Sequence, residues 1–540
     1  MRKNGKYILL FFLGVLAASG AFLLPGCGWL MLLALVPLLS AERIATLEGR
    51  KHFWIFHYSF FLVWNLLTTW WVCNATVGGG IFASVANALQ MSVVFGLFRW
   101  VKKRMNGGVL PYIFLAAAWI AWEKYYLDAA QISWPWLVLG NAFSRTLPLV
   151  QWYEFTGTLG GSLWVWAVNL AVFEIMVALS DGSWGRRNGK ARGAAVTGLV
   201  LVVLAPVALS LGIWWSYRET DDPLDVAILQ PNIDPYNKFT AMSQQQQNAI
   251  LLDQAQKAVR ERRDTVTPLL ILTPETFTSD IWVNDPMLSP TYRRMVGFTR
   301  EHPWCNILLG AVSIERFENR PSRTARQWAG YDGWIETHNS ALMVDSTGRK
   351  DIFHKSKLVV GVESTPYPAV FVPLDEKLGG VMGRDVGQDS VTCLTFRAAG
   401  REIPVGCAIC YESVYGNYCR DYIRAGAQLL TVITNDAWWG DTPGYRQHLS
   451  YASLRAIETR RDIARCANTG ISALIDQRGR ILEKTPWWQS ATLSGRVNLS
   501  SRQTFFVRVG DIPGRLSVFV FLLLLCAAGS SGKKHRLRAK

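Results

Sequence analysis

Eight long apolar runs, separated by short polar connections, constrain the fold of this chain more than any other feature of its sequence. A helix needs about 20 residues to cross the hydrocarbon core of a bilayer, and about 17 is the practical minimum. The second and eighth runs are short, so their assignment also rests on the charges between the runs. We predict a polytopic bundle of eight membrane helices, at about residues 7–24, 29–39, 53–73, 81–100, 111–127, 162–179, 194–215 and 516–528.

The charges between these runs predict their orientation. Lys and Arg gather before the first run, between the second and third, after the fourth, between the sixth and seventh, and in the tail 533–540. The connections 25–28 and 74–80 contain neither residue. Cytoplasmic connections are enriched in Lys and Arg, so we expect both termini in the cytoplasm. This pattern also accounts for the formal net charge of +16 without nucleic acid as a partner.

The N-terminus has a second interpretation. A basic start, an apolar stretch and then Leu24-Pro25-Gly26-Cys27 look like a signal peptide that ends in a lipobox. The apolar run is longer than the about 7–15 residues usual for a signal peptide, and Pro25 adjoins the potential cleavage site. We expect the segment to be retained, with processing near Cys27 as the alternative.

The chain between the seventh and eighth runs has a different texture, in which short β-branched runs alternate with longer polar stretches. Such alternation predicts a layered α/β domain. We expect a seven-helix membrane domain at 1–215, an extracytoplasmic catalytic domain at 216–500, and a linker, last membrane helix and basic tail at 501–540. The expected strands are 226–229, 269–272, 307–312, 340–344, 405–409 and 429–433, and the expected helices are 244–262 and 447–461.

Three of the short runs lead into reactive side chains. Glu275 follows Leu272-Thr273-Pro274, Lys355 follows Phe353-His354, and Cys410 follows Ile409. A carboxylate can take the thiol proton, an ammonium can stabilise a tetrahedral oxyanion, and the sulfur can hold an acyl group as a thioester. Together these groups suffice for covalent acyl transfer.

Each of these residues has a simpler explanation when it is taken alone. A single Glu or Lys at a strand end is usually solvated, and a single Cys usually packs in a core. Cys407 and Cys410 also form a C-x-x-C pair, typical of a disulfide or redox site, although strand residues three apart point to opposite faces. The seven His residues show no ligand spacing, so we expect no metal. Pairing remains open for Cys305, Cys393, Cys419 and Cys466.

Several motifs surround the three residues: P-E-T at 274–276, K-x-x-L-V at 355–359 followed by Glu363, C-Y-E at 410–412, T-N-D-A-W-W-G at 434–440, and the segment 455–472. These motifs resemble the nitrilase superfamily, and the resemblance implies an α-β-β-α sandwich for the catalytic domain. Joined to the helical segments, they are similar to the apolipoprotein N-acyltransferase family, as are W-P-W-L-x-L-G at 134–140 and L-Q-P-N-I at 229–233. The resemblance covers nearly the whole chain.

Carried over residue by residue, the resemblance implies roles for nine side chains. Glu275 corresponds to the general base, Lys355 to the cation that stabilises the oxyanion and Cys410 to the nucleophile. Six further residues are expected to support the site or bind substrate: Glu363, Tyr411, Glu412, Phe239, Asn339 and Trp438.

The chain departs from the family pattern at two places. Residues 358–363 read L-V-V-G-V-E where the family usually has L-V-P-F-G-E, which leaves the shape of the loop before Glu363 open. Phe239 stands where the family has a Trp after L-Q-P-N. The replacement leaves open whether this position keeps its hydrophobic contact to lipid.

The resemblance implies an acyltransferase of the bacterial inner membrane that acts in the last step of lipoprotein maturation. It would move the sn-1 acyl chain of a glycerophospholipid, through a thioester, to the N-terminal amine of a diacylglyceryl-cysteine apolipoprotein. We expect a periplasmic catalytic domain, a monomer and no cofactor. A membrane-tethered amidase that uses water is the alternative enzyme, and a non-catalytic scaffold that binds lipoproteins is the alternative outside enzymes.

Overall fold

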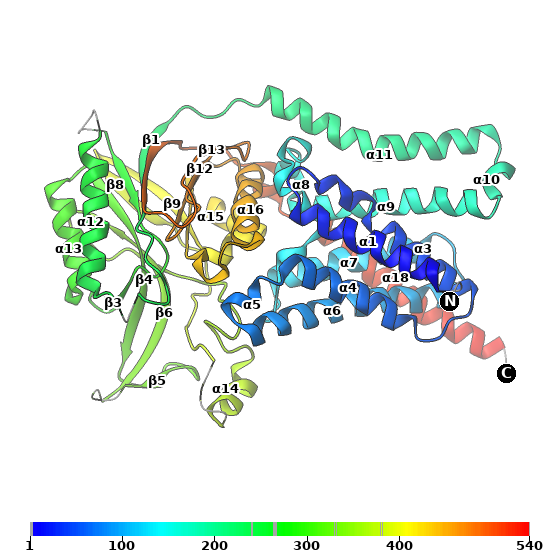
Figure 1. Ribbon diagram of the computed structural model, residues 1–540, viewed down its shortest axis with the longest axis horizontal. Helices are drawn as coiled ribbons and strands as arrows, with labels where there is room; N and C mark the ends of the chain where they lie inside the picture. Colours follow the sequence, from blue (N-terminus) through cyan, green and yellow to red (C-terminus); the bar gives the residue numbers. More distant parts are fainter. Residues whose placement is uncertain are drawn as a thin grey trace. The chain divides into compact units, whose positions relative to one another are not determined.

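The chain forms two compact units, which are labelled along the ribbon in Figure 1. The first comprises Met1–Tyr217 with Val509–Lys540, and the second comprises Arg218–Arg508. The computed structural model describes residues 4–238, 241–262, 267–328, 330, 332–377, 380 and 382–538.

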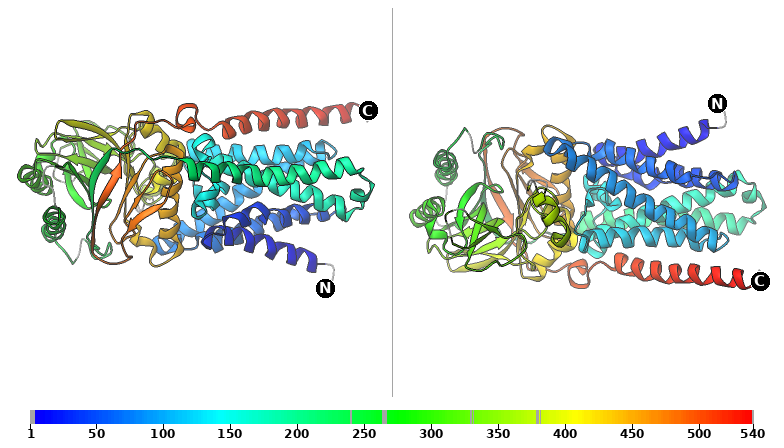
Figure 2. Two further views of the ribbon diagram at one scale, coloured as in Figure 1. Left: turned by 90° about the horizontal axis from the view of Figure 1, so that it is seen from above. Right: turned by 90° about the horizontal axis from the view of Figure 1, so that it is seen from below.

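All eight predicted runs of the first unit are helical, and Figure 2 shows the long helices running alongside one another. Short helices connect them: α5 (Val72–Ala75), η2 (Pro135–Leu137), η3 (Leu139–Arg145), η4 (Leu147–Leu149), α8 (Tyr153–Thr156) and α10 (Ser183–Arg186). The long helices are α1 (Gly5–Leu23), η1 with α2 and α3 (Gly28–Leu30, Met31–Ala34, Val36–Leu47), α4 (Phe53–Thr69), α6 (Val77–Arg104), α7 (Leu110–Asp128), α9 (Thr158–Ser180), α11 (Gly189–Ser216) and α18 (Ile512–Arg538).

Within the described residues, six of these eight segments are long and apolar enough to cross a membrane, and α4 and α7 are not among them. The α4 helix has only 17 residues. The α7 helix carries Glu123, Lys124 and Asp128 near its end. The predicted polytopic helical bundle is therefore confirmed. Of the eight predicted spans, six are long and apolar enough to cross a membrane.

The second segment is longer than its apolar run because a polar residue is buried inside the bundle. We expected this run to end near residue 39, but α3 continues to Leu47. Glu42 lies within it, is 1% exposed, and forms an ion pair with Lys102 of α6 at 2.5 Å. A partner from another helix thus allows a carboxylate where hydropathy predicts the end of the run.

The α11 helix exposes almost its whole apolar surface. Only 6% of its most apolar stretch is buried within the protein, and Leu201, Leu204 and Leu209 are each more than half exposed. A helix of this length with an apolar surface is suited to a lipid environment. Together with the other apolar helices, it makes this chain a membrane protein.

The second unit contains two β-sheets. The first has the order β14-β1-β2-β4-β6-β5, with β3 paired to β4 and β7 to β6, and the second has the order β13-β12-β11-β10-β9-β8. The first sheet comprises β1 (Pro223–Gln230), β2 (Leu269–Leu272), β3 (Thr278–Trp282), β4 (Cys305–Phe317), β5 (Arg326–Gln327), β6 (Trp334–Val344), β7 (Ile352–His354) and β14 (Ala491–Asn498). The second comprises β8 (Leu394–Ala398), β9 (Arg401–Ile409), β10 (Leu429–Thr434), β11 (Ile463–Ala467), β12 (Ala473–Ile475) and β13 (Ile481–Lys484).

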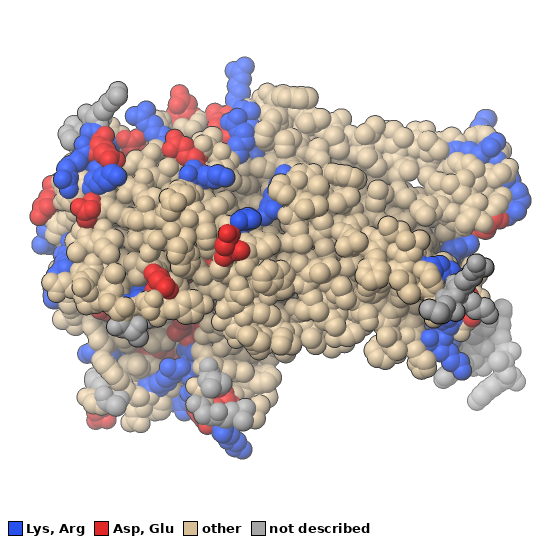
Figure 3. All heavy atoms as spheres, in the orientation of Figure 1, with Lys and Arg blue, Asp and Glu red and all other residues tan. Residues whose placement is uncertain are grey.

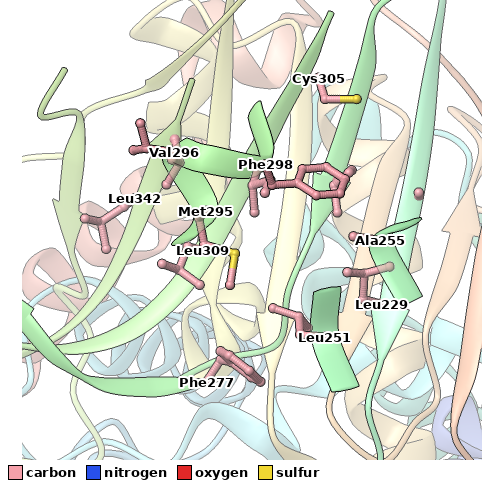
Figure 4. Close-up of a cluster of buried hydrophobic side chains, with 14 of the residues drawn as sticks. Leu229, Leu251, Ala255, Phe277, Met295, Val296, Phe298, Cys305, Leu309 and Leu342 are labelled. Atoms are coloured by element: carbon pink, nitrogen blue, oxygen red, sulfur yellow. The ribbon is translucent and has the colours of Figure 1, made fainter. Parts of the chain in front are cut away.

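Helices cover the outer faces of both sheets, which gives the expected α-β-β-α sandwich. Figure 4 shows the core under two of them, α12 (Gln244–Arg260) and α13 (Pro290–Glu301), where Leu251 and Met295 meet Leu229 and Leu309 of the first sheet. The remaining helical elements are η5 (Pro286–Leu288), α14 (Pro368–Lys377), η6 (Cys410–Val414), α15 (Gly416–Arg424), η7 (Asp436–Trp439), α16 (Pro443–Thr459) and α17 (Phe505–Val509), of which α15 and α16 cover the second sheet.

The elements predicted for this unit are confirmed. Each of the six expected strands lies within an observed strand, and the two expected helices correspond to α12 and α16. Cys407 ends up in β9 and Cys410 at the start of η6, and all nine cysteines are free thiols in this structure.

Candidate active site

The three reactive residues come from both sheets. Glu275 follows β2 and Lys355 follows β7, both in the first sheet, while Cys410 follows β9 in the second. Lys355 Nζ lies 3.1 Å from Glu275 Oε1. Cys410 lies close enough to both charged groups that each shifts the pKa of its thiol. The structure therefore brings together residues that are up to 135 positions apart in the sequence.

Lys355 is held between two carboxylates. It is 1% exposed, and its Nζ donates to Glu275 Oε1 and, at 2.8 Å, to Glu363 Oε1. Burial alone lowers the pKa of Lys355, but the charges of Glu275 and Glu363 outweigh it and raise the pKa well above its usual value. The ammonium therefore stays protonated, as a cation that stabilises an oxyanion must.

Asn339 joins the same two carboxylates. Its Nδ2 donates to Glu275 Oε1 and to Glu363 Oε1, each at 2.8 Å, and the residue is 2% exposed. The second oxygen of Glu275 accepts from the backbone N–H of Asn435 at 3.1 Å. Because both oxygens of Glu275 are held by donors, its orientation is fixed before any substrate arrives.

The loop before Glu363 keeps that carboxylate in place despite its changed sequence. Glu363 Oε2 accepts from the backbone N–H of Val359 at 2.7 Å, and the Glu363 N–H donates to the Val359 carbonyl at 2.8 Å. Gly361 has a φ of 84°, a conformation that favours glycine. The residues that replace the family pattern thus form a tight turn that directs Glu363 at Lys355.

A glycine lets the loop that carries Glu275 approach β4. A side chain at Gly310 would place its Cβ 2.2 Å from the carbonyl oxygen of Pro274. The Gly310 N–H instead donates to Thr273 Oγ1 at 3.0 Å. Any larger residue would push the general-base candidate away from Lys355.

Cys410 occupies a strained backbone position at the point where β9 turns into η6. Its φ is 53°, in the left-handed region that a non-glycine residue adopts rarely and at a free-energy cost. Cys410 as a whole residue is partly exposed, whereas Tyr411 and Glu412 beside it are buried. The strained residue therefore marks the junction between β9 and η6.

The thiol of Cys410 is protonated at rest. Burial and then the charge of Glu275 raise its pKa well above the usual value, while Lys355 and a hydrogen bond with Thr434 oppose the shift. A thiolate is the reactive form of cysteine, so a reaction at Cys410 would depend on a base that removes its proton. Glu275 is the carboxylate whose charge acts most strongly on it.

Glu412 connects the segment after Lys355 to the segment that carries Cys410. Its Oε1 accepts from the backbone N–H groups of Ser356 at 2.6 Å and Lys357 at 3.1 Å, and its Oε2 accepts from that of Ile409 at 2.8 Å. Burial raises the pKa of Glu412 to about 7. One buried carboxyl group thus fixes the distance between two strand ends that belong to different sheets.

Sequence reasoning missed a buried polar network beside the backbone of Cys410. His448 Nε2 lies 3.0 Å from the carbonyl oxygen of Cys410, and His448 Nδ1 lies 2.9 Å from Asp436 Oδ1. Arg465 donates to Asp436 Oδ2 at 2.6 Å. Burial raises the pKa of Asp436, but His448 and Arg465 overcome it and lower the pKa to about 2. Asp436 and Arg465 lie inside the quoted motifs, whereas no local pattern marks His448.

Lys238 is a further buried lysine, which the sequence did not indicate. It is 6% exposed, and its Nζ donates to the carbonyl oxygen of Thr276, the residue after Glu275. Burial lowers the pKa of Lys238 to about 8, against the charge of Glu275. It therefore adds a further positive charge beside the loop of the general-base candidate.

Among the remaining predicted residues, Tyr411 and Trp438 make aromatic contacts. Tyr411 is 7% exposed and packs edge-on against Tyr415. Trp438 is 39% exposed and packs edge-on against Tyr236, which is 61% exposed. Phe239 lies outside the described residues. The two exposed rings form an apolar surface near Asn435, whose N–H holds Glu275.

The described residues contain no group of three or more His, Cys, Asp or Glu side chains that could hold a metal ion. The chemistry available to the cluster is that of a thiol, an ammonium and carboxylates. Such a set can form and resolve an acyl-sulfur bond.

Comparison with known proteins gives two family matches. Residues 225–505 match the family described as carbon-nitrogen hydrolase. Residues 13–171 match the N-terminal domain of apolipoprotein N-acyltransferase. The first match contains every residue of the polar cluster, and the second falls within the helical unit.

Relatives align with both units at once. The chain is 29% identical over 503 residues to the apolipoprotein N-acyltransferase of Chlorobaculum tepidum, covering 89% of this chain and 88% of the relative. It is 30% identical over 525 residues to that of Geobacter metallireducens, covering 94% and 92%. It is 29% identical over 562 residues to that of Gloeobacter violaceus, covering 97% and 96%. The similarity therefore extends across the membrane unit and the sandwich alike.

Proposed function

Because the chain belongs to the apolipoprotein N-acyltransferase family, and so is an acyltransferase with a carbon-nitrogen hydrolase domain, we propose that it transfers the sn-1 acyl chain of a glycerophospholipid to a lipoprotein amine through a thioester on Cys410. The acceptor is the N-terminal amine of the diacylglyceryl-cysteine of an apolipoprotein. The observation that supports this most is the position of Lys355, held by Glu275 and Glu363 beside the thiol of Cys410.

In the first half-reaction Glu275 takes the proton of the Cys410 thiol, and the sulfur attacks the carbonyl carbon of the ester. Negative charge develops on the former carbonyl oxygen and is stabilised by the ammonium of Lys355. The carbon–oxygen bond to glycerol then breaks, and the proton held by Glu275 passes to the departing oxygen. A lysophospholipid leaves, and the acyl group remains as a thioester.

In the second half-reaction the lipoprotein amine attacks the thioester carbonyl. Glu275 accepts the proton that the amine loses, and Lys355 again stabilises the oxyanion. The carbon–sulfur bond breaks, the proton returns to the sulfur, and an amide has formed. Both steps use the same three groups, so the roles proposed for Glu275, Lys355 and Cys410 account for the full cycle.

The other contacts suit supporting roles. Asn339 orients the two carboxylates around Lys355, and Glu412 fixes the segment that carries Cys410. The exposed rings of Trp438 and Tyr236 offer an apolar surface suited to acyl chains. Tyr411 packs beside the nucleophile, and we assign Phe239 a hydrophobic contact to lipid from its position in the sequence.

Both substrates are lipids of a membrane surface, which gives the helical unit its purpose. We propose that the chain spans the bacterial inner membrane several times as a monomer, with 216–500 in the periplasm and both termini in the cytoplasm. The support is the distribution of Lys and Arg between the apolar runs. No cofactor enters the proposed cycle.

The test is to incubate the purified protein with a phospholipid labelled in its sn-1 chain and a diacylglyceryl lipopeptide. We expect label on the lipopeptide amine, and an acyl adduct on Cys410 in the mass spectrum when the lipopeptide is omitted. Cys410→Ala should abolish both signals. Cys393→Ala removes a thiol outside the cluster and should retain both.

The same experiment separates transfer from hydrolysis. A membrane-tethered amidase would release free labelled fatty acid and leave the lipopeptide unmodified. Label on the lipopeptide from Cys410→Ala protein would exclude the thioester.

A further inference from the structure

Two adjoining cavities lie at the basic end of the helical unit, within that unit alone. The first, of about 790 Å³, is bounded by α3, α6, α7, α9 and the turn at 107–109. The second, of about 720 Å³, is bounded by α3, α6 and residues 49–50 and 106–107. Thr46, Lys102 and Gly107 line both, so these residues form a shared wall. Each volume is in the range typical of small-molecule sites.

The two cavities differ in chemistry. The larger one is mostly apolar, with Tyr112, Ile113, Leu170, Phe173 and Val177 among its lining residues. The smaller one is lined by the four basic residues Arg50, Arg99, Lys102 and Lys103 and by the single carboxylate Glu42. An apolar chamber that adjoins a cationic one matches the two parts of an anionic lipid.

The shared wall is built around the buried carboxylate of Glu42. Lys102 Nζ lies 2.5 Å from Glu42 Oε2, and Thr46 Oγ1 donates to Glu42 Oε1 at 2.8 Å. Lys102 also lies over the ring of Tyr112, 5.2 Å from its centroid. Arg99 Nε lies 3.5 Å from Glu42. One buried carboxylate therefore faces two cations, which leaves an excess of positive charge for an anionic ligand.

The other basic residues add to that excess. Lys103 is exposed and forms no ion pair within the described part of the chain, and Arg50 pairs with the exposed carboxylate of Glu48. Gly107 and Gly108, with φ of 84° and 85°, form the turn beside the wall without side chains that would close it. Figure 3 shows Lys and Arg gathered at this end, whereas charged residues are few along the rest of the helical unit on the face that is drawn.

From this arrangement we infer that the helical unit binds an anionic diacyl phospholipid here, with its phosphate in the smaller cavity, among Arg50, Arg99, Lys102 and Lys103, and an acyl chain in the larger cavity. Basic residues that only orient a membrane protein have no need to converge on a cavity, and these do. The site is separate from the proposed reaction. It lies at the end that we propose to face the cytoplasm, where anionic headgroups attract Lys and Arg.

The test uses full-length Cys410→Ala protein in a neutral detergent, so that lipid is bound without being consumed. Phosphatidylglycerol, phosphatidylcholine and inorganic phosphate are titrated separately, and bound lipid is counted by native mass spectrometry. We compare Arg50→Gln/Lys103→Gln with the control Lys190→Gln/Arg192→Gln. The control removes two exposed basic residues at the same end that line neither cavity.

We expect the first pair of substitutions to weaken phosphatidylglycerol binding about 25-fold, since each Lys or Arg near an anionic lipid contributes about fivefold. The control pair and the affinity for phosphatidylcholine should change little. Lipid bound at the proposed active site contributes equally to all variants, so the difference between the pairs reports this site. An equal loss of phosphatidylglycerol affinity in the two double variants would overturn the proposal. Displacement of the lipid by millimolar inorganic phosphate would also overturn it.

A second pair of variants tests the apolar cavity. Ala171→Trp fills the larger cavity from α9, whereas Met176→Trp adds the same ring at an exposed position of α9 that does not line it. We expect Ala171→Trp to lose the phosphatidylglycerol adduct and Met176→Trp to keep it. Retention by Ala171→Trp, with an unchanged melting temperature, would show that no acyl chain enters this cavity.

Discussion

The two units each contain an ion-pair cluster around one buried residue, but with opposite proportions of charge. In the sandwich, Lys355 faces Glu275 and Glu363, so one cation lies between two anions. In the helical unit, Glu42 faces Lys102 and Arg99, so one anion lies between two cations. The comparison teaches that the ratio of charges, more than the presence of a buried ion pair, indicates what such a cluster can do.

In the first cluster the surplus carboxylate keeps the lysine protonated and leaves a base beside the thiol. In the second the surplus cation remains available to a ligand. Burial makes both ratios consequential, because charges that are removed from water interact more strongly. Four substitutions test this difference, and they are ordered here by the size of the expected effect.

Removing the central cation of the first cluster should have the largest effect. Lys355→Met should lower kcat for amide formation on a lipopeptide by about 10²–10³, since one oxyanion donor contributes that much. Lys484→Met, at an exposed position of β13, is the control and should leave the rate unchanged. The rate is measured by mass spectrometry of the lipopeptide. A loss smaller than about tenfold would assign Lys355 another role.

Glu412 sharpens the comparison because three backbone N–H groups donate to its carboxyl group. Burial raises its pKa to about 7 from 4.5, so the folded state binds the proton more tightly than the unfolded state. Its contribution to the free energy of unfolding should therefore fall by about 3 kcal/mol as pH rises from about 5 to about 8.

Denaturant unfolding of the full-length protein, followed by tryptophan fluorescence at several pH values, measures this effect. Glu412→Gln should flatten the pH dependence. Glu483→Gln, at an exposed position of β13, should leave it as it is. A dependence that persists unchanged in Glu412→Gln would mean that this carboxyl group does not titrate in that range.

Removing the only carboxylate between the two cations of the second cluster should have opposite effects on folding and binding. Glu42→Gln leaves Lys102 and Arg99 facing each other without an anion. We expect the free energy of unfolding to fall by about 2 kcal/mol. This is less than for a fully buried pair, because both cations are partly exposed. Phosphatidylglycerol should bind more tightly.

Melting temperature and native mass spectrometry read these two effects separately. Glu174→Gln is the control for folding, since this carboxylate is 62% exposed and should contribute less than about 0.5 kcal/mol. Weaker binding of the anionic lipid to Glu42→Gln would contradict the charge argument.

The smallest effect should come from a neutral side chain of the first cluster. Asn339→Ala removes the amide shared by Glu275 and Glu363 but leaves every charge in place. Hydrogen bonds to charged groups contribute about 1.5 kcal/mol or more, so kcat should fall about tenfold. Asn284→Ala, whose amide bonds only to the backbone of Arg316, is the control. A larger loss than that of Lys355→Met would show that orientation outweighs charge here.

Much of the architecture was predictable because it depends on local patterns. Apolar runs predicted all eight long helical segments. The alternation of short β-branched runs with longer polar stretches predicted the strands and the layered domain. The three candidates Glu275, Lys355 and Cys410 were predictable because each follows an apolar run. A polar or reactive side chain at the end of such a run indicates a possible functional role. Lys238 and His448 were not, since their partners come from distant segments.

The sequence by itself determined which segments suit a membrane, which form strands and which side chains are candidates for the chemistry, because hydropathy and residue type are properties of short stretches. Only the tertiary structure decided the ratios of charge. Glu42 meets a lysine 60 positions away and Glu275 meets one 80 positions away, each across separate elements. Whether a buried charge has a partner depends on how elements pack, and no local pattern contains that information.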